Sequence, residues 1–133
     1  KAYSKGLDFG CGSGPALQFM LQQSGHEVCL YDLHYYPCKR VLDTQYDFIC
    51  ATEVVEHLKS PRETFLQIKR CLKPNAIFAV MTQLIISPER FVTWRYIQDP
   101  THVCFFNIKS LSYVAELMDR KLEHVDRDVI FIR

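Results

Sequence analysis

The chain has 133 residues, enough for one compact domain and too few for a second hydrophobic core, so residues 1–133 are expected to form a single domain. Its net charge is +1 and its basic residues are scattered, which disfavours a nucleic-acid partner. No apolar run approaches the roughly 20 residues that span a bilayer, and the first residues do not resemble a signal peptide. We therefore expect no membrane association and a cytoplasmic location.

The six cysteines do not form a recognisable framework. Cys29 and Cys50 lie within apolar, strand-like runs, Cys71 lies on an apolar helix face, and no pair has CxxC spacing. This pattern is typical of buried free thiols in a reducing compartment. The sequence therefore predicts neither disulfides nor a metal site.

The first part of the chain alternates short apolar runs with helical patterns, which is typical of an α/β domain with a parallel sheet. A first strand is expected to end at Leu7–Phe9, and a second covers Glu27–Tyr31. Between them, Leu17, Met20 and Leu21 recur at helical spacing.

The middle of the chain continues this alternation with one irregularity. Residues 33–45 are too few for a full helix and strand, so we expect only a vestigial strand at Arg40–Leu42. Tyr46–Thr52 has the continuous apolar interior of a strand covered on both faces. Ser60–Glu63 combines an N-cap serine, a proline and a glutamate in a capping-box pattern that opens a helix, and Ala76–Thr82 follows as another buried strand.

The last third begins with a long aromatic-rich segment, residues 83–106. Asn107 is then expected to cap a final helix. The buried stripe of this helix is Leu111, Val114, Met118 and Leu122. The few residues that remain suffice for one strand at Asp128–Ile132 rather than for a hairpin.

A glycine-rich loop joins the first strand to the first helix, in the segment LDFGCGSG from Leu7 to Gly14. Glycine accepts positive φ and lets the backbone approach a ligand closely, and the N–H groups of such a loop create an electropositive rim. Asp32 ends the second strand, where an acidic side chain can accept hydrogen bonds from ribose hydroxyls. The alternative interpretation is a tight turn with an incidental surface aspartate.

The glycine spacing separates two classes of cofactor. Dinucleotide sites use G-x-G-x-x-G, whereas this loop reads G-x-G-x-G with Asp8 two residues before the first glycine. It resembles motif I of class I S-adenosylmethionine-dependent methyltransferases. The resemblance implies that Asp8 braces the loop near the methionine ammonium, that the glycines contact the methionine portion, and that Asp32 binds the ribose. The implied cofactor residues in this part of the chain are Asp8, Phe9, Gly10, Cys11, Gly12, Gly14, Asp32 and Leu33. A buried Asp8 would need donors, so backbone N–H partners in the loop are expected.

The run YDFICATEVVEHL, from Tyr46 to Leu58, strengthens the resemblance. It is similar to a motif of ubiquinone-biosynthesis-type O-methyltransferases, as is the turn Lys73–Asn75, where asparagine replaces the usual glycine and tolerates a left-handed conformation. The resemblance places Thr52, Glu53 and Val54 against the cofactor.

Two histidines are candidate catalytic residues. His57, four residues after Glu53, is expected on the same side as that glutamate, although helix capping and fold support are the favoured explanation of Glu56–His57. His102 could take a proton from an acceptor hydroxyl, and Asp99 could orient it or merely cap a turn.

The resemblance implies that residues 83–106 cover the methyl acceptor. Trp94, Tyr96 and Phe105 offer flat apolar surfaces for a planar acceptor, although such aromatic residues could equally fill the core.

The implied fold is a Rossmann-like, doubly wound, mostly parallel sheet with helices on both faces, shortened at the third strand and at the C-terminal end. Asp43 is a candidate adenine partner in the shortened region. A trimmed sheet exposes an edge, which makes a homodimer a reasonable hypothesis.

The predicted function is transfer of a methyl group from S-adenosylmethionine to a small-molecule acceptor, through a hydroxyl or another nucleophile. Two alternatives stay open: a catalytically idle methyltransferase-like binding module, and, less favoured by the glycine spacing, a nucleotide-cofactor oxidoreductase.

Overall fold

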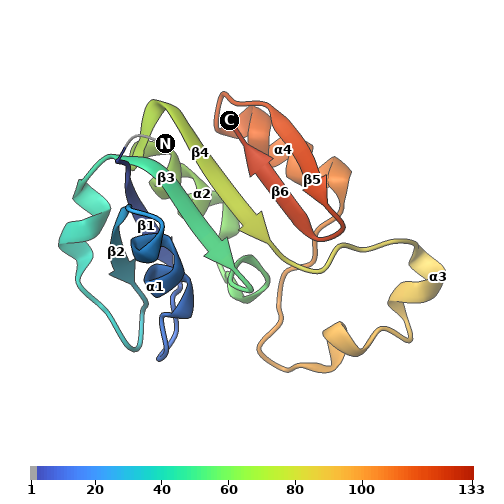
Figure 1. The fold of residues 1–133 in the computed structure, drawn as a ribbon. Helices are drawn as coiled ribbons and strands as arrows, with labels where there is room; N and C mark the ends of the chain where they lie inside the picture. The colour runs from blue at the N-terminus through green and yellow to red at the C-terminus, as the bar shows by residue number, and fades with distance from the viewer. Residues whose placement is uncertain (1–2) are drawn as a thin grey trace.

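A computed structural model describes residues 3–133 as one six-stranded mixed sheet flanked by helices (Figure 1). The strands are β1 (Lys5–Phe9), β2 (Glu27–Tyr31), β3 (Tyr46–Thr52), β4 (Leu72–Met81), β5 (Leu122–Asp126) and β6 (Val129–Ile132). The α-helices are α1 (Ala16–Gln23), α2 (Pro61–Arg70), α3 (Pro88–Phe91) and α4 (Ile108–Leu117). The 3-10 helices are η1 (Lys39–Asp43), η2 (Val55–His57) and η3 (Arg95–Gln98).

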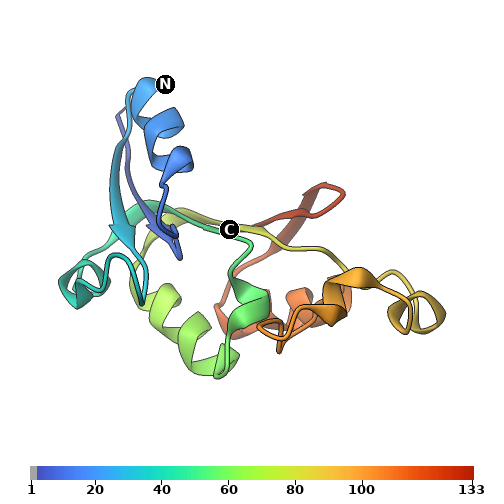
Figure 2. The same cartoon turned by 90° about the horizontal axis from the view of Figure 1, so that it is seen from below.

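The strand order is β2-β1-β3-β4-β6-β5, with parallel pairing through the first four strands. Seen from below, α1 lies on one face of the sheet and α2 and α4 lie on the other (Figure 2). This arrangement confirms the predicted Rossmann-like α/β fold. Two of the predicted strands, Glu27–Tyr31 and Tyr46–Thr52, have the expected bounds.

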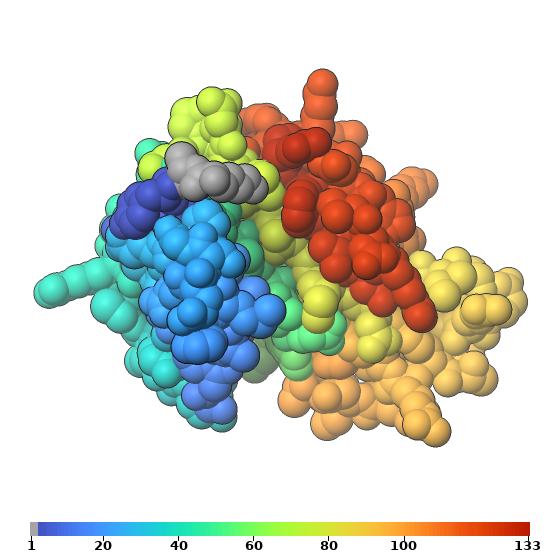
Figure 3. All heavy atoms as spheres, in the orientation of Figure 1, coloured from blue at the N-terminus to red at the C-terminus, as the bar shows by residue number. Residues whose placement is uncertain are grey.

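The hydrophobic core lies between the sheet and the pair α2 and α4. Ile49 and Phe78 on the sheet and Leu111 on α4 have no exposed surface. The opposite face has less cover, because α1 contributes no buried residue and its Met20 is 65% exposed. In the space-filling view, a strip of the central strands is visible between α1 and the C-terminal hairpin (Figure 3).

The C-terminal end contains the hairpin that sequence reasoning excluded. β5 pairs with β6, and β6 pairs with β4, both antiparallel. The prediction of a single strand is wrong because α4 ends earlier than expected. Asp119 has a positive φ of 55°, which turns the chain out of the helix, so that Leu122 opens β5 instead of extending the helical stripe.

The connection after β2 also differs from the prediction. The expected vestigial strand at Arg40–Leu42 is part of the 3-10 helix η1. Asp43 ends that helix just before the amino end of β3, whereas the glycine loop follows the carboxyl end of β1. Since β1 and β3 run parallel, these are opposite edges of the sheet, and the assignment of Asp43 as an adenine partner is wrong.

Two local predictions also fail. Lys73–Asn75 belongs to β4 at a shift of register against β3, and among residues 3–133 only Glu53 and Asp119 are non-glycine residues with positive φ, so Asn75 makes no left-handed turn. Ser60 is the N-cap of α2, but its side chain makes no capping hydrogen bond.

The predicted acceptor-covering segment, residues 83–106, leaves the sheet as a long loop that carries α3 and η3 (Figure 1). Its two ends meet in a β-bridge between Leu84 and Phe106, and the Ile85 N–H donates to the Phe106 carbonyl at 2.8 Å. Asn107 then caps α4 as predicted, accepting a hydrogen bond from the Ser110 N–H. Within residues 3–133, no helix is long and apolar enough to cross a bilayer.

Candidate active site

The glycine loop follows β1 at the carboxyl edge of the sheet. Gly10 and Gly12 have positive φ values of 76° and 66°, and the Gly10 N–H donates to the Tyr31 carbonyl at 2.7 Å. A Cβ added at Gly10 would lie 2.4 Å from the Val54 side chain. A Cβ added at Gly12 or Gly14 would meet no atom within 4 Å. Gly10 is therefore required by packing, whereas the space in front of Gly12 and Gly14 is open to a ligand.

Asp32 braces this loop from the end of β2. Its carboxylate accepts hydrogen bonds from the backbone N–H groups of Gly12 at 3.0 Å, His34 at 2.8 Å and Tyr35 at 3.1 Å. Partial burial opposes ionisation of this carboxyl group, but these donors outweigh it and hold its pKa below the usual value. Asp32 is thus a fixed negative charge beside the open face of the loop. Leu33, next to it, is 66% exposed.

Asp8 is a buried acidic group on β1, with 4% of its surface exposed. Burial raises the pKa of its carboxyl group to about 6. No hydrogen bond among residues 3–133 reaches this carboxylate, so the prediction of backbone N–H partners is wrong. A buried carboxylate without a donor gains most from a cationic ligand. Its neighbour Phe9 is also buried, stacked on the Tyr31 ring at 5.3 Å, and Cys11 is half-buried.

The carboxyl end of β3 lies next to the glycine loop, because β3 pairs in parallel with β1. Thr52 and Glu53 are exposed there, and Val54 packs against Gly10. Glu53 has a positive φ of 53°, a conformation that costs about 1–2 kcal/mol outside glycine, and strain of this kind is often kept at functional sites. Although Glu53 is exposed as a residue, partial desolvation of its carboxyl group and the neighbouring charge of Glu56 raise the pKa of that group, against an opposing hydrogen bond from Tyr96.

Glu56 is fully buried and organises the polar centre of the site. Its carboxylate accepts from the Tyr96 hydroxyl at 2.5 Å and from the Thr82 hydroxyl at 3.0 Å. The prediction that Tyr96 offers a free apolar surface is therefore wrong, because the residue is only 8% exposed and its hydroxyl also lies 2.9 Å from Glu53. Burial and the hydrogen bond to Glu56 raise the pKa of the Tyr96 hydroxyl. Sequence reasoning missed Thr82, and no local pattern marks it.

The two predicted catalytic histidines lie together beside this centre. The His57 and His102 rings meet edge to face, with centroids 4.7 Å apart. His57 Nδ1 lies 3.1 Å from the Thr101 carbonyl oxygen, and His102 Nδ1 lies 2.7 Å from that of Tyr96. The Glu56 carbonyl accepts backbone N–H groups of the segment just after His102, which ties the long loop to η2.

Asp99 fills one of the two roles that the sequence left open, that of capping the turn before Thr101. One carboxylate oxygen caps the turn by accepting from the Thr101 N–H at 2.8 Å and from its hydroxyl at 2.6 Å. The other oxygen lies 3.7 Å from His102 Nε2.

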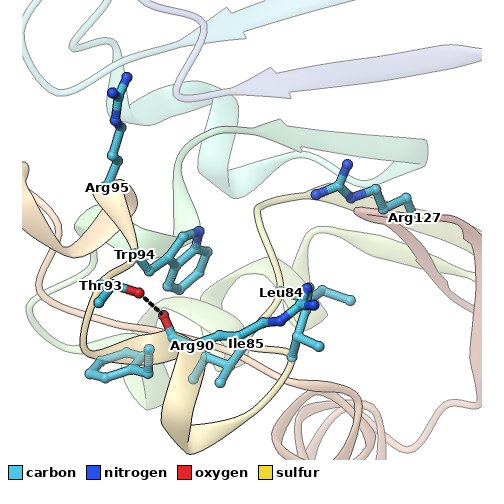
Figure 4. Close-up of a pocket in the computed structure, with 9 residues that line it drawn as sticks. Leu84, Ile85, Arg90, Thr93, Trp94, Arg95 and Arg127 are labelled. Atoms are coloured by element: carbon cyan, nitrogen blue, oxygen red, sulfur yellow. Dashed lines mark hydrogen bonds between the residues drawn. The ribbon is translucent and has the colours of Figure 1, made fainter.

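A hollow of about 520 Å³ lies in the predicted acceptor-covering segment (Figure 4). It is lined by Leu84, Ile85, Ile86, Arg90, Phe91, Thr93, Trp94, Arg95 and Arg127. Trp94 lies on the wall of this hollow, whereas Phe105 packs against Phe91 with ring centroids 5.4 Å apart and is not a lining residue. Acceptor binding by either residue stays a prediction. Sequence reasoning missed these arginines. Arg90 and Arg95 lie within the predicted segment but follow no pattern there, and Arg127 comes from the β5–β6 turn and reaches this place only in the folded chain.

A family model described as a methyltransferase domain matches residues 1–124. The chain belongs to this methyltransferase-domain family. None of the curated proteins compared with the chain matches it.

Solved structures share the fold of this methyltransferase domain at low sequence identity. The YcgJ protein of Bacillus subtilis has 16% identity and a TM-score of 0.68, with 95% of this chain and 65% of YcgJ covered. The 1,6-didemethyltoxoflavin-N1-methyltransferase of Burkholderia thailandensis, solved with bound 1,6-didemethyltoxoflavin and S-adenosylhomocysteine, has 16% identity and a TM-score of 0.70, with 97% of this chain and 69% of that protein covered. A SAM-dependent methyltransferase of Archaeoglobus fulgidus has 19% identity and a TM-score of 0.69, with 95% and 66% covered. The chain therefore spans about two thirds of these proteins, and the ubiquinone-biosynthesis-type subgroup stays a prediction.

Proposed function

We propose that this methyltransferase domain binds S-adenosylmethionine and transfers its methyl group to a small molecule. The observation that carries the proposal is the glycine loop, whose open side at Gly12 and Gly14 is flanked by the buried carboxylate of Asp8 and the fixed charge of Asp32. The residues present fit the cofactor. An ammonium would give Asp8 the cationic partner that it lacks, and no side chain fills the space in front of the two glycines.

When bound, the cofactor supplies a methyl group on positively charged sulfur, which is already electrophilic. The chain then needs only to position the acceptor and to remove its proton. Asp8, the glycine loop and Asp32 would hold the cofactor at the carboxyl edge of the sheet. His57 and His102 would face the acceptor, because they stand beyond the end of β3 on the same edge.

The hollow beside Trp94 supports a small acceptor with a planar apolar part and a negative charge. Trp94 and Phe91 supply aromatic walls, and Arg90, Arg95 and Arg127 also line the hollow, although the Arg95 guanidinium points away from Trp94 (Figure 4). Arginine binds carboxylate and phosphate groups in bidentate geometry. The methyltransferase of Burkholderia thailandensis, named for a toxoflavin precursor, is a small-molecule enzyme with the same fold.

Calorimetric titration with S-adenosylhomocysteine tests the cofactor site. We expect Asp32→Ala to weaken binding at least tenfold, because it removes the acceptor that holds the Gly12 N–H. Asp43→Ala is the matched control, since Asp43 lies at the opposite edge of the sheet and should leave the affinity unchanged. A wild-type chain that binds neither S-adenosylmethionine nor S-adenosylhomocysteine would show the proposal to be wrong.

Turnover distinguishes an enzyme from an idle binding module. Incubation of the chain and a cell extract with methyl-labelled S-adenosylmethionine should label a small molecule that is absent when the Asp32→Ala variant is used. Cofactor binding without any labelled product would favour the idle module. A change of NADH fluorescence on titration with the chain would instead favour an oxidoreductase.

A further inference from the structure

The hollow beside Trp94 concentrates positive charge. Its lining residues include Arg90, Arg95 and Arg127 and no aspartate or glutamate. The whole chain has a net charge of only +1, so these arginines do not belong to a generally basic surface. In Figure 4 the guanidinium groups of Arg90 and Arg127 lie on the Leu84 side of Trp94, whereas Arg95 extends the other way.

The guanidinium groups of Arg90 and Arg127 have donors free for a ligand. Among residues 3–133, the Arg90 side chain forms no salt bridge and no hydrogen bond. Arg127 contacts Asp128 through Nε at 3.6 Å, and within the same residues its terminal nitrogens have no acceptor. Two guanidinium groups on one side of a hollow repel each other, and an anion placed between them attracts both.

The hairpin turn that carries Arg127 is anchored to the wall of the hollow. One carboxylate oxygen of Asp128 accepts from the Leu84 N–H at 3.1 Å, and the other oxygen is the one that faces Arg127. The Asp128 carbonyl accepts from the Thr82 N–H at 3.1 Å. Arg127 therefore reaches the hollow from the sheet, whereas Arg90 reaches it from the long loop. An anion bound by both would tie the loop to the β5–β6 turn.

Trp94 is a fixed, flat wall of the same hollow. Its indole Nε1 donates to the side-chain oxygen of Gln83 at 3.2 Å. The Tyr96 ring lies against the indole with centroids 4.9 Å apart, and the Tyr96 hydroxyl reaches Glu53, just after β3. One aromatic residue therefore separates the hollow from the edge of the sheet at which the cofactor is proposed to bind.

We propose that Arg90 and Arg127 bind the carboxylate or phosphate group of an aromatic acid, whose ring lies against Trp94. Arginine donates two parallel hydrogen bonds to either group. The assignment rests on the proposed function and adds an orientation to it. The anion lies on the Leu84 side, so the atom that receives the methyl group lies at the other end of the ring, towards Tyr96 and the end of β3. The acceptor is therefore an aryl carboxylate or phosphate with its anion and its nucleophile on opposite sides of the ring.

Fluorescence of Trp94, the single tryptophan of the chain, tests the site without reference to turnover. Benzoate and phenyl phosphate are the anionic probes, and benzamide is the uncharged match of benzoate. We expect saturable quenching by at least one of the anions and none by benzamide over the same concentrations. The anion that binds more tightly identifies the group that the arginines recognise. Added salt should weaken the binding, because both arginines are exposed.

Substitution of the arginines tests the assignment directly. Arg127→Gln and Arg90→Gln should each weaken binding of the anion about fivefold, as expected for an exposed pair that gains from bidentate geometry. Arg40→Gln is the matched control, because Arg40 is an exposed arginine of η1, which lies at the opposite end of the molecule from α3 (Figures 1 and 2). All three side chains are exposed, so the variants are expected to fold, and thermal melting checks this.

Quenching that does not saturate, equal quenching by benzamide, or equal affinity in the Arg127→Gln variant would each overturn the proposal. Titration of the wild-type chain with S-adenosylhomocysteine in parallel separates the two proposals. Cofactor binding without anion binding refutes the aromatic-acid site alone, and anion binding without cofactor binding refutes the proposed function alone.

Discussion

Replacing each glycine of the cofactor loop by alanine separates packing from ligand binding. An alanine at Gly10 would adopt a φ of 76°, which costs about 1–2 kcal/mol for a residue with a Cβ. Its Cβ would also lie 2.4 Å from Val54, a stiff β-branched side chain, and overpacking of this kind costs about 1–3 kcal/mol. We therefore expect Gly10→Ala to lower the free energy of unfolding by about 2–5 kcal/mol.

Gly12→Ala should behave differently. Gly12 has a φ of 66°, and a methyl group added there would stand in open space, so only the conformational cost of about 1–2 kcal/mol applies. Gly25→Ala is its control, because Gly25 combines a φ of 86° with open space at the far end of α1. The two variants should lose similar stability, yet only Gly12→Ala should lose affinity for S-adenosylhomocysteine.

Urea unfolding measures the stabilities and calorimetry measures the affinities. Equal cofactor affinity in Gly12→Ala and Gly25→Ala would refute the inference that the open space beside Gly12 belongs to the cofactor. An unchanged stability of Gly10→Ala would refute the packing argument for that glycine.

Two further predictions concern buried polar groups. The pKa of Asp8 is about 6, above its unfolded value, so the folded chain loses stability as pH rises from about 4 through about 6. Asp8→Asn should remove that loss, so the free energy of unfolding measured in urea should increase more at pH 8 than at pH 5. An equal increase at both pH values would contradict this prediction. Tyr96→Phe removes a donor from the buried Glu56 carboxylate and should lower the unfolding free energy by about 1–3 kcal/mol. The control is Tyr113→Phe on the exposed face of α4, and equal melting temperatures for the two variants would contradict the prediction.

The parts of the fold that depend on local pattern were predictable. Glu27–Tyr31 and Tyr46–Thr52 are short, apolar and bounded by turn residues, so their strands have the expected limits. The glycine loop was predictable because positive φ at Gly10 and Gly12 is a property of the residues themselves. The end of α4 was not, because an aspartate rather than a glycine takes the left-handed position at residue 119.

The polar centre of the site was beyond sequence reasoning for a different reason. Glu56 meets Thr82 and Tyr96 across 26 and 40 residues of chain, and no periodic pattern links positions so far apart. His57 and His102 were identified individually, but their contact depends on the path of the long loop.

The bridge between Leu84 and Phe106 closes residues 83–106 into a loop whose two ends lie side by side, so this loop could be replaced as a unit. The chain leaves and re-enters the sheet at adjacent points. A different loop whose two ends lie equally close together could therefore be grafted there without altering the strand order. Under the proposed function, such a graft would change acceptor specificity, because the hollow beside Trp94 lies mostly within the loop. It would have to keep Tyr96 and His102, whose partners belong to the scaffold.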